Sequence, residues 1–318
     1  MATAKIPRAS TFLVALFITG SSQAQTPPIS FAWQDLPLDL PPSITVRAAS
    51  ATTPEGLPIR AWVADIDFND TALTARPVLS DASSGKEPVS NLAGQHGAWL
   101  AVNGGYFDMA SRPAKTYSLV RNYSETLREN IGTVVRTNGR YPVRRAAFGV
   151  SPTRDFLFDW IAHQKGNILT FAQPLPHTPL VIAPVPDDQP TGDWNAVPDA
   201  IGGGPMLLCD GKIAITYNEE AFFGSGFSAD KPYPRTAIAA TANHHLLLLI
   251  ADGKQPDWSI GLTLQQCAET LKELGAINAM NLDGGGSTTL YADGQVLNRP
   301  SDGRERNVTS ILAIVPYG

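Results

Sequence analysis

Short apolar runs separated by turn-forming residues recur through most of this chain, and they constrain its fold more than any other feature. From residue 59 onward, runs such as AWLAVNGGYF, GTVVRTNGRYPV, GPMLLCDGKIAI and HHLLLLIADG alternate with Gly, Pro, Asn and Asp. Short runs with this punctuation are typical of β-strands joined by turns. Asp210-Gly211, between two apolar stretches, is also a hairpin signal. The sequence therefore predicts a strand-rich fold.

One segment has helical periodicity instead. In LTLQQCAETLKELGA, the apolar residues at 264, 267, 268, 271 and 274 share one helical face. Thr263 and Gln266 have the spacing of a capping box, and Gly275 stands where a left-handed C-cap is expected. The apolar AINAMNL that follows predicts a buried strand leading into Asp283. The expected fold class is α+β: a single domain with a mixed, strand-rich sheet and few helices.

The first 24 residues have the pattern of a secretory signal peptide. Lys5 and Arg8 precede an apolar stretch, and small residues follow up to Ala24, after which we expect cleavage. A membrane anchor is the alternative, but the apolar stretch is only about ten residues, whereas a span needs roughly 20. The sequence thus predicts a secreted or periplasmic protein with no integral membrane segment after signal cleavage.

Two further segments are rich in proline. Residues 25–58 are expected to lie over the surface or to act as a tether, so the folded domain is placed at 59–318. Residues 165–200 contain PLPHTPLVIAPVPDDQPTG, which could link two domains. Because similar strand patterns occur on both sides, we expect a long surface loop within one domain.

Charge and cysteine content exclude some classes of function. The formal net charge is −5, and removing residues 1–24, with two positive and no negative residues, gives −5 − 2 = −7. A nucleic-acid partner is not expected, since the isoelectric point of about 5.5 is far below that of basic binding domains. Cys209 and Cys267 either pair in an exported protein or remain as buried thiols, and the sequence leaves this open.

Three glycine clusters follow apolar runs: NGG at 103–105, GGG at 202–204 and GGG at 284–286. Consecutive glycines let backbone amides approach a ligand and can form an anion-binding nest. Each cluster alone is more often a turn, but the three together favour a shared cleft. A phosphate-binding P-loop is excluded because 276–296 contains no lysine, and the strand pattern after the last cluster argues against a Rossmann turn.

Five motifs occur in an order that resembles the phosphodiester glycosidase family: AVNGGYFD, GGGPMLLCDGK, PRTAIAAT, GAINAMNLDGGGSTTLY and VLNRPSDGRERNVTSILAIV. The resemblance covers roughly residues 60–317. It implies hydrolysis of a sugar-1-phosphodiester, such as an N-acetylglucosamine-1-phosphodiester or a related glycan or exopolysaccharide, at the glycosidic C1–O bond. The alternative is a non-catalytic glycan- or phosphate-binding module on the same fold. The sugar and the aglycone stay open, because the loops between the motifs match no family pattern.

Such a reaction needs a carboxylate, either as nucleophile or as base for water. Asp283, at the end of the predicted strand, is the first candidate. Asp108 and Glu305 are the second and third. Each has a simpler alternative as a turn residue, and the sequence does not say which carboxylate does which step, or whether the chemistry retains or inverts configuration.

The substrate's phosphate and sugar also need binding groups. The resemblance implies phosphate binding by Arg235 and Arg306; for Arg235 a structural ion pair is the alternative. Tyr106 and Phe107 are either a sugar platform or core residues. The remaining candidates belong to the same motifs: Asn103, Gly104, Gly203, Gly204, Thr236, Gly284, Gly285, Gly286, Ser287 and Thr288. No cofactor is firmly implied; a structural or catalytic calcium ion stays open, because it would leave little sequence trace.

Overall fold

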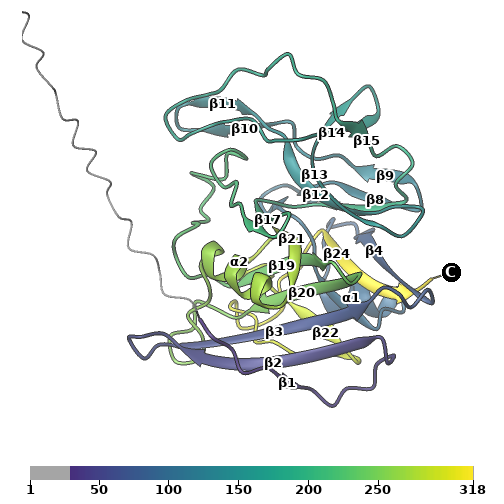
Figure 1. Cartoon of the computed structure of the whole chain (residues 1–318), viewed down its shortest axis with the longest axis vertical. Helices are drawn as coiled ribbons and strands as arrows, with labels where there is room; N and C mark the ends of the chain where they lie inside the picture. The colour runs from purple at the N-terminus through teal and green to yellow at the C-terminus, as the bar shows by residue number, and fades with distance from the viewer. Residues whose placement is uncertain (1–28, 318) are drawn as a thin grey trace, which may run out of the picture.

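The computed structural model describes residues 29–317, which fold into stacked β-sheets with two short α-helices (Figure 1). The expected signal peptide lies outside the described residues. The central sheet has eight strands, in the order β1 (Gln34–Asp35), β2 (Ile44–Thr52), β3 (Pro58–Asp67), β20 (His245–Ala251), β19 (Arg235–Thr241), β21 (Ala276–Asn281), β17 (Met206–Cys209) and β18 (Lys212–Ile213).

Two smaller sheets pack against it. The seven-stranded sheet, at the top of Figure 1, has the order β15 (Gly192–Asp193), β14 (Asn167–Phe171), β13 (Phe156–Gln164), β12 (Arg145–Val150), β16 (Asp199–Gly202), β8 (Val120–Asn122) and β9 (Glu125–Arg128). The five-stranded sheet has the order β23 (Gln295–Val296), β22 (Leu290–Ala292), β5 (Leu100–Asn103), β24 (Ser310–Pro316) and β4 (Leu73–Leu79).

Two hairpins and two helices complete the described chain. The hairpins are β10 (Thr133–Arg136) with β11 (Gly139–Pro142), and β6 (Phe107–Asp108) with β7 (Lys115–Thr116). The helices are α1 (Val89–Gln95) and α2 (Leu264–Glu273). The strand-rich expectation is confirmed. Within residues 29–317 every strand pair in the three sheets is antiparallel, so the sheets are not mixed as expected.

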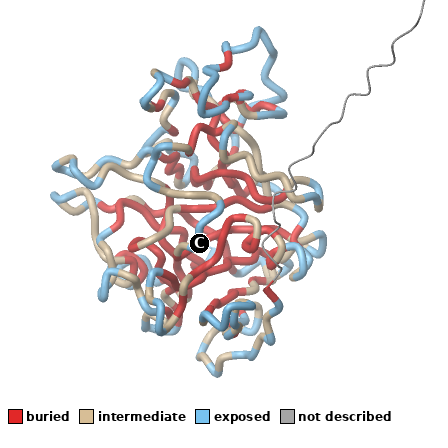
Figure 2. The backbone as a smooth tube through the Cα atoms, turned by 90° about the vertical axis from the view of Figure 1, so that its left-hand side faces the viewer, coloured by how far each residue is buried: buried red, intermediate tan, exposed pale blue. Residues whose placement is uncertain are grey.

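The central sheet is buried on both faces. Along β3, Ala64 and Ile66 face the core between the sheets, whereas Ala61 and Val63 face the cluster under α2. Successive side chains of a strand point to opposite faces, so both faces of β3 and β20 must be apolar. This explains why HHLLLLIA reads as a continuous apolar run. Figure 2 shows the buried backbone running through the middle of the molecule.

Helix α2 forms as the sequence predicted. Thr263 Oγ1 accepts a hydrogen bond from Gln266 N at 3.1 Å, and Thr263 N donates to Gln266 Oε1 at 3.0 Å, which is the capping box. Gly275 follows with φ +89°, the left-handed conformation expected after the helix. The apolar face of α2 packs on the central sheet and directs β21 into the core.

The N-terminal boundary differs from the expectation. The nine residues of β2 pair with β3 along their whole length, and Val46 belongs to the main core. Much of the segment 25–58 is therefore part of the domain's sheet and not a tether. The proline-rich stretch after β14 returns to pair with the same strand as β15, so it is a loop of the seven-stranded sheet, as expected.

Both cysteines are free thiols in this structure. Cys209 packs beside the core between the sheets and Cys267 packs under α2, so the two thiols belong to different clusters. Burial raises the pKa of Cys209 to about 11 and that of Cys267 to about 12, which keeps both protonated at neutral pH. Within residues 29–317, no helix has the length and apolar character that crossing a bilayer requires.

Candidate active site

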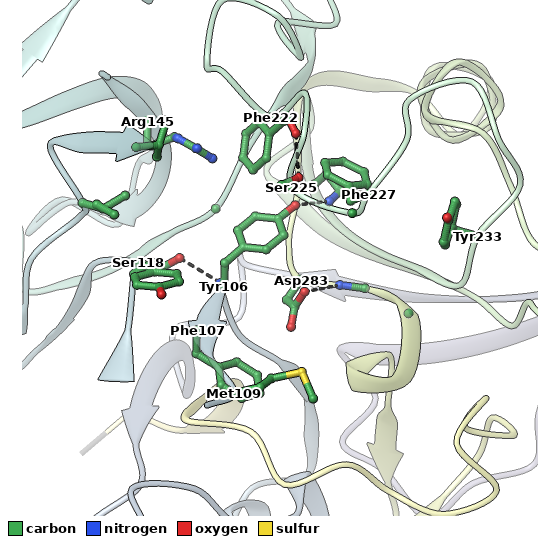
Figure 3. A pocket seen from close by; sticks show the side chains of 18 of the residues that line it. Tyr106, Phe107, Met109, Ser118, Arg145, Phe222, Ser225, Phe227, Tyr233 and Asp283 are labelled. Carbon is green, nitrogen blue, oxygen red and sulfur yellow. Dashed lines mark hydrogen bonds between the residues drawn. The ribbon is translucent and has the colours of Figure 1, made fainter. Parts of the chain in front are cut away.

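A cavity of about 700 Å³ lies where the central and seven-stranded sheets face each other. Its walls come from segments far apart in the chain: the loop after β21, the start of β19, the start of β12, hairpin β10–β11 and the connection between β18 and β19 (Figure 3). Two of the three glycine clusters contribute residues to it, Gly203 and Gly284–Gly286. The prediction that glycine loops line a common cleft therefore holds for these two clusters.

Asp283 reaches this cavity from the end of β21. Its backbone is held on both sides, since its N–H donates to Gly104 O at 3.2 Å and its C=O accepts from Asn103 Nδ2 at 2.6 Å. Its carboxylate accepts a hydrogen bond from Gly284 N at 2.9 Å and faces the cavity. Half-buried in this setting, it is a fixed carboxylate with one side open to a ligand.

The surroundings of Asp283 bring the pKa of its carboxyl group close to neutral pH. Burial raises the pKa of Asp283 to about 6, while hydrogen bonds from Ser287 and Gly284 and the charge of Arg306 act in the opposite direction. At neutral pH the group is therefore mostly ionised and still basic enough to take a proton. A carboxylate in this range suits a general base or a nucleophile.

The glycine loop after Asp283 turns through one 3-10 turn, Gly285–Ser287. Its amides are largely used within the fold: Gly285 N donates to Pro234 O at 3.0 Å, and Ser287 N and Thr288 N donate back to the loop's own carbonyls. The expected nest of free amides is therefore not present, because the turn consumes them. Among the described residues, only Gly286 N in this 3-10 turn has no acceptor.

The glycines instead permit close packing. A Cβ on Gly286 would overlap Arg306 Nη2 and the Asp302 carboxylate, and one on Gly284 would lie 2.7 Å from Pro234 O. Gly285 has φ +63°, a conformation that L side chains rarely adopt. The loop can therefore bring Asp283 and Arg306 together only with glycine at these positions.

The two arginines expected to bind phosphate both line the cavity but differ in their bonds. Arg306 forms an ion pair with Asp302 at 2.8 Å and lies 3.5 Å from Ser287 Oγ. Arg235, only 2% exposed, donates Nε to Leu262 O at 2.9 Å and Nη2 to the carbonyls of Ser228 and Lys231. Arg235 thus connects loops around the cavity. Within the described chain its hydrogen bonds go to backbone carbonyls and not to an acidic side chain, so it is not held by the structural ion pair that was the alternative.

Arg145 is a cavity residue that the sequence did not single out. It stands at the start of β12, is 6% exposed, and stacks on the ring of Phe222 with 3.7 Å from Cζ to the ring centroid. Among residues 29–317 its guanidinium has no hydrogen-bond or ion-pair partner, and its Nε is fully buried. Burial lowers its pKa to about 10, so it stays charged at neutral pH. The one available signal was an arginine at the start of a buried strand in RRAAFGV.

The sequence model of the phosphodiester glycosidase family matches residues 96–315, more than two thirds of the chain. The chain belongs to the phosphodiester glycosidase family.

Relatives of this chain differ in sequence identity and in the share of the chain that they match. The mouse N-acetylglucosamine-1-phosphodiester α-N-acetylglucosaminidase is 39% identical over 74 residues, 23% of this chain and 14% of that protein, so the match spans a small part of the mouse protein's length. The catalytic domain of the zebrafish protein of that name, auto-inhibited by its pro-peptide, has a TM-score of 0.61 at 21% identity and covers 89% of this chain and 87% of that one. A structure described as an exported protein of Burkholderia pseudomallei has a TM-score of 0.57 at 19% identity, over 84% and 76% of the two chains. These two structures show the same fold.

The other two carboxylate candidates, Asp108 and Glu305, do not line the cavity. Glu305 accepts hydrogen bonds from Ser90 N at 2.9 Å and Ser90 Oγ at 2.6 Å, so it caps the N-terminus of α1. Asp108 accepts from Ala110 N at 2.9 Å, which is a turn bond. Among the described residues Asp283 is the one acidic side chain lining the cavity.

Several motif residues lie behind the cavity wall. Asn103 is fully buried, accepts from Thr236 Oγ1 at 2.7 Å, and braces the Asp283 carbonyl, so it orients the catalytic candidate and does not face a sugar. Others support the wall by packing or by allowing close approach: Gly104 against Ser310, Gly204 against Glu220 with φ +108°, and the buried Ser287 and Thr288.

Tyr106 and Phe107 do line the cavity. The Tyr106 hydroxyl donates to Gly204 O and accepts from Asn281 Nδ2, each at 2.8 Å, and its ring centroid lies 5.1 Å from that of Phe222. Burial and the neighbouring Asp283 raise the pKa of Tyr106, so it stays protonated. The aromatic wall is thus rigid and half-buried, as a sugar platform requires.

No cation site stands out in the described part of the chain, where no three His, Cys, Asp or Glu side chains are grouped to hold a metal ion.

Proposed function

We propose that this protein is an exported hydrolase that cleaves the glycosidic bond of a sugar-1-phosphodiester, with N-acetylglucosamine-1-phosphodiesters as the first candidates. Water adds to C1 of the sugar, the C1–O bond breaks, and the phosphate leaves as a monoester of the other alcohol. The observation that carries this proposal is a single basic carboxylate, Asp283, in a cavity whose other charged side chains are all positive.

The charge of the cavity fits a phosphodiester. Its lining includes five cationic side chains against the one carboxylate of Asp283: Arg136, Arg145, Arg235, Lys254 and Arg306. A cavity lined by one sign of charge raises the local concentration of the opposite ion, and fixed cations stabilise charge that develops on a leaving phosphate. An uncharged glycan would gain less from this lining than a phosphodiester.

A single carboxylate suffices for such a leaving group. An ordinary glycoside needs a second, protonated carboxyl to protonate the departing oxygen. A phosphodiester already departs as a stabilised anion, so the leaving oxygen needs little proton transfer. Asp283 can then act as the nucleophile at C1 or as the base that activates water, and Arg306 lies close enough to affect its charge.

The test is incubation of the mature protein with N-acetylglucosamine-1-phospho-methanol, with free sugar and methyl phosphate measured separately. We expect both products from the wild type and a loss of at least about 1,000-fold in kcat for Asp283→Asn, as for other essential catalytic groups. Glu305→Gln is the control, since it alters the cap of α1 and should keep the activity.

Three outcomes would contradict the proposal. Equal activity of Asp283→Asn and wild type would remove Asp283 from the chemistry. Release of sugar-1-phosphate would mean that the other ester bond is cleaved. Binding of sugar phosphodiesters without any turnover would favour the non-catalytic glycan- or phosphate-binding module.

Export is proposed from the pattern of residues 1–24, and the fold shared with a Burkholderia protein described as exported is consistent with it. Expression of the full chain in a bacterial host with a periplasm should yield a protein whose N-terminal sequence begins at Gln25. An intact N-terminus on a membrane-bound product would instead indicate an anchor.

A further inference from the structure

We propose that Arg145 is the residue that binds the phosphate of the substrate, through its guanidinium and the phosphate's non-bridging oxygens. This assignment rests on the proposed function, and it names a residue outside the five family motifs. It begins from a charged group that is buried and has no partner in the described structure.

Buried arginines in folded proteins are normally paired, because an unpaired charge away from water is costly. Arg144, the neighbour of Arg145 in sequence, shows the usual arrangement: its two Nη atoms lie 2.6 and 2.5 Å from the Asp188 carboxylate. Arg145 has the same degree of burial, 6% exposed, and no such bond. The fold therefore holds an unpaired guanidinium in the cavity wall, with its Nε buried, where it can bind an anion that is not part of the described chain.

Glu220, the buried acid whose charge acts on Arg145, forms no direct bond with it. Glu220 is fully buried, and both of its oxygens are engaged: Oε2 accepts from Ala146 N at 2.9 Å, and Oε1 accepts from Met206 N, Trp160 Nε1 and Thr216 Oγ1. Glu220 acts on Arg145 only through its charge. The donors of Arg145 remain for a ligand.

The other arginines of the cavity are less suited to this role. Arg136 donates Nε and Nη2 to Ala221 O, Arg235 donates to three carbonyls, and Arg306 is paired with Asp302. A free, planar guanidinium offers parallel N–H donors to two phosphate oxygens, whereas a lysine ammonium binds phosphate as a point charge. Arg145 also stacks on Phe222, which fixes the plane in which it can donate.

The position of Arg145 also fits the reaction. In Figure 3, Tyr106 lies between Arg145 and Asp283, and both charged groups face the same cavity. A glycosyl phosphate lying along Tyr106 would place its phosphate toward Arg145 and C1 toward Asp283. The leaving phosphate and Asp283 would then lie on opposite sides of C1, as displacement by Asp283 or by water that it activates requires.

Binding of methyl phosphate, the product of the methyl diester, tests the assignment without needing turnover. By calorimetry we expect Arg145→Gln to weaken methyl phosphate binding at least about tenfold, the effect of losing a charge-assisted hydrogen bond, and Arg145→Lys to recover part of it. Arg144→Gln is the matched control and should bind as the wild type does. Unchanged affinity in a folded Arg145→Gln protein, or a wild type that binds no methyl phosphate at millimolar concentration, would overturn the proposal.

A second comparison separates this inference from the proposed function. With the phosphodiester, Arg145→Gln should lower kcat/KM about 100-fold or more, whereas with p-nitrophenyl N-acetylglucosaminide, whose leaving group lacks phosphate, it should change little. Asp283→Asn should lose activity on both. Equal losses on both substrates for Arg145→Gln would contradict phosphate recognition. If methyl phosphate binds through Arg145 while the wild type cleaves neither substrate, the proposed function fails and the phosphate site stands.

Discussion

At the scale of single residues, Asp283 combines two demands that oppose each other. The chemistry proposed for it needs the ionised form, whereas burial in the cavity raises its pKa to about 6. The fold limits that rise by placing the Gly284 amide and the charge of Arg306 beside the carboxylate. The balance between burial, which raises the pKa, and these two neighbours, which lower it, sets the pH range in which Asp283 is ionised.

We therefore expect kcat/KM to rise with pH through a limb near 6, since activity follows the ionised fraction of Asp283. Because the charge of Arg306 lowers the pKa of Asp283, Arg306→Gln should move that limb to higher pH as well as lower the rate. Initial rates between pH 4.5 and 8.5 measure both. An activity that increases on acidification through pH 6 would show that the protonated form is the active one.

The same pKa predicts a pH-dependent stability. An acid whose folded pKa is about 6 and whose unfolded pKa is about 3.9 binds its proton more tightly in the folded protein. Ionisation therefore costs folding free energy, and this cost grows as the pH rises from about 4 to about 6 and is complete above that. Asp283→Asn should be more stable than the wild type by about 3 kcal/mol at pH 7.5, and by no more than about 0.5 kcal/mol at pH 4. Urea unfolding at both pH values measures the difference, and a gain independent of pH would rule out this origin.

At the scale of elements, the glycine loop after β21 acts by close packing. Its amides are bonded within the fold, so its contribution is to let Arg306 and Asp302 pack against Gly286. The sequence placed this loop in the candidate site, and the loop does line the cavity, but the sequence suggested a different reason for its glycines. Three consecutive glycines look the same in a sequence whether they bind a ligand or allow a neighbour to approach.

Gly286→Ala tests this interpretation. The added methyl group would displace Arg306 from its pair with Asp302, so we expect kcat/KM to fall at least about tenfold. Gly132→Ala is the control, because no atom lies within 4 Å of the added Cβ and the backbone there is ordinary. Wild-type rates for Gly286→Ala would mean that Arg306 is not needed where it lies.

Some elements were predictable and others were not. Helix α2 follows from apolar periodicity and a local capping box, both of which are written within ten or so residues. Strand β2 was missed because its alternating pattern follows the proline-rich stretch of the same segment. Its pairing with β3 extends over all nine residues of β2, and such pairing between strands cannot be recognised from the sequence of one segment alone.

At the scale of the whole molecule, the pairing of β2 with β3 predicts where the folded domain begins. A chain beginning at residue 58 would expose the edge of β3 and remove Ile44 and Val46 from the main core. We expect it to be insoluble or unfolded, since an unpaired apolar edge promotes aggregation. A chain beginning at residue 29 should fold and unfold cooperatively in urea. Equal stability of the two chains would show that β1 and β2 are dispensable.

The cavity itself is a product of sheet packing, and this decides which site residues the sequence could reveal. Asp283 and Arg306 were found because motifs mark them locally. Glu305 was overestimated because its partner Ser90 lies 215 residues away in sequence. Arg145 was missed for a similar reason: a charge without a partner can be recognised only when the surrounding sheets are in place.

Hydrolysis in water enriched in oxygen-18 distinguishes cleavage of the C1–O bond from attack at phosphorus. The methyl phosphate released from N-acetylglucosamine-1-phospho-methanol is analysed by mass spectrometry, since oxygens on phosphorus do not exchange with water under these conditions. Attack at C1, as proposed for Asp283 and its cationic cavity, predicts methyl phosphate without the heavy isotope. Methyl phosphate carrying one oxygen-18 would show attack at phosphorus and would contradict the account.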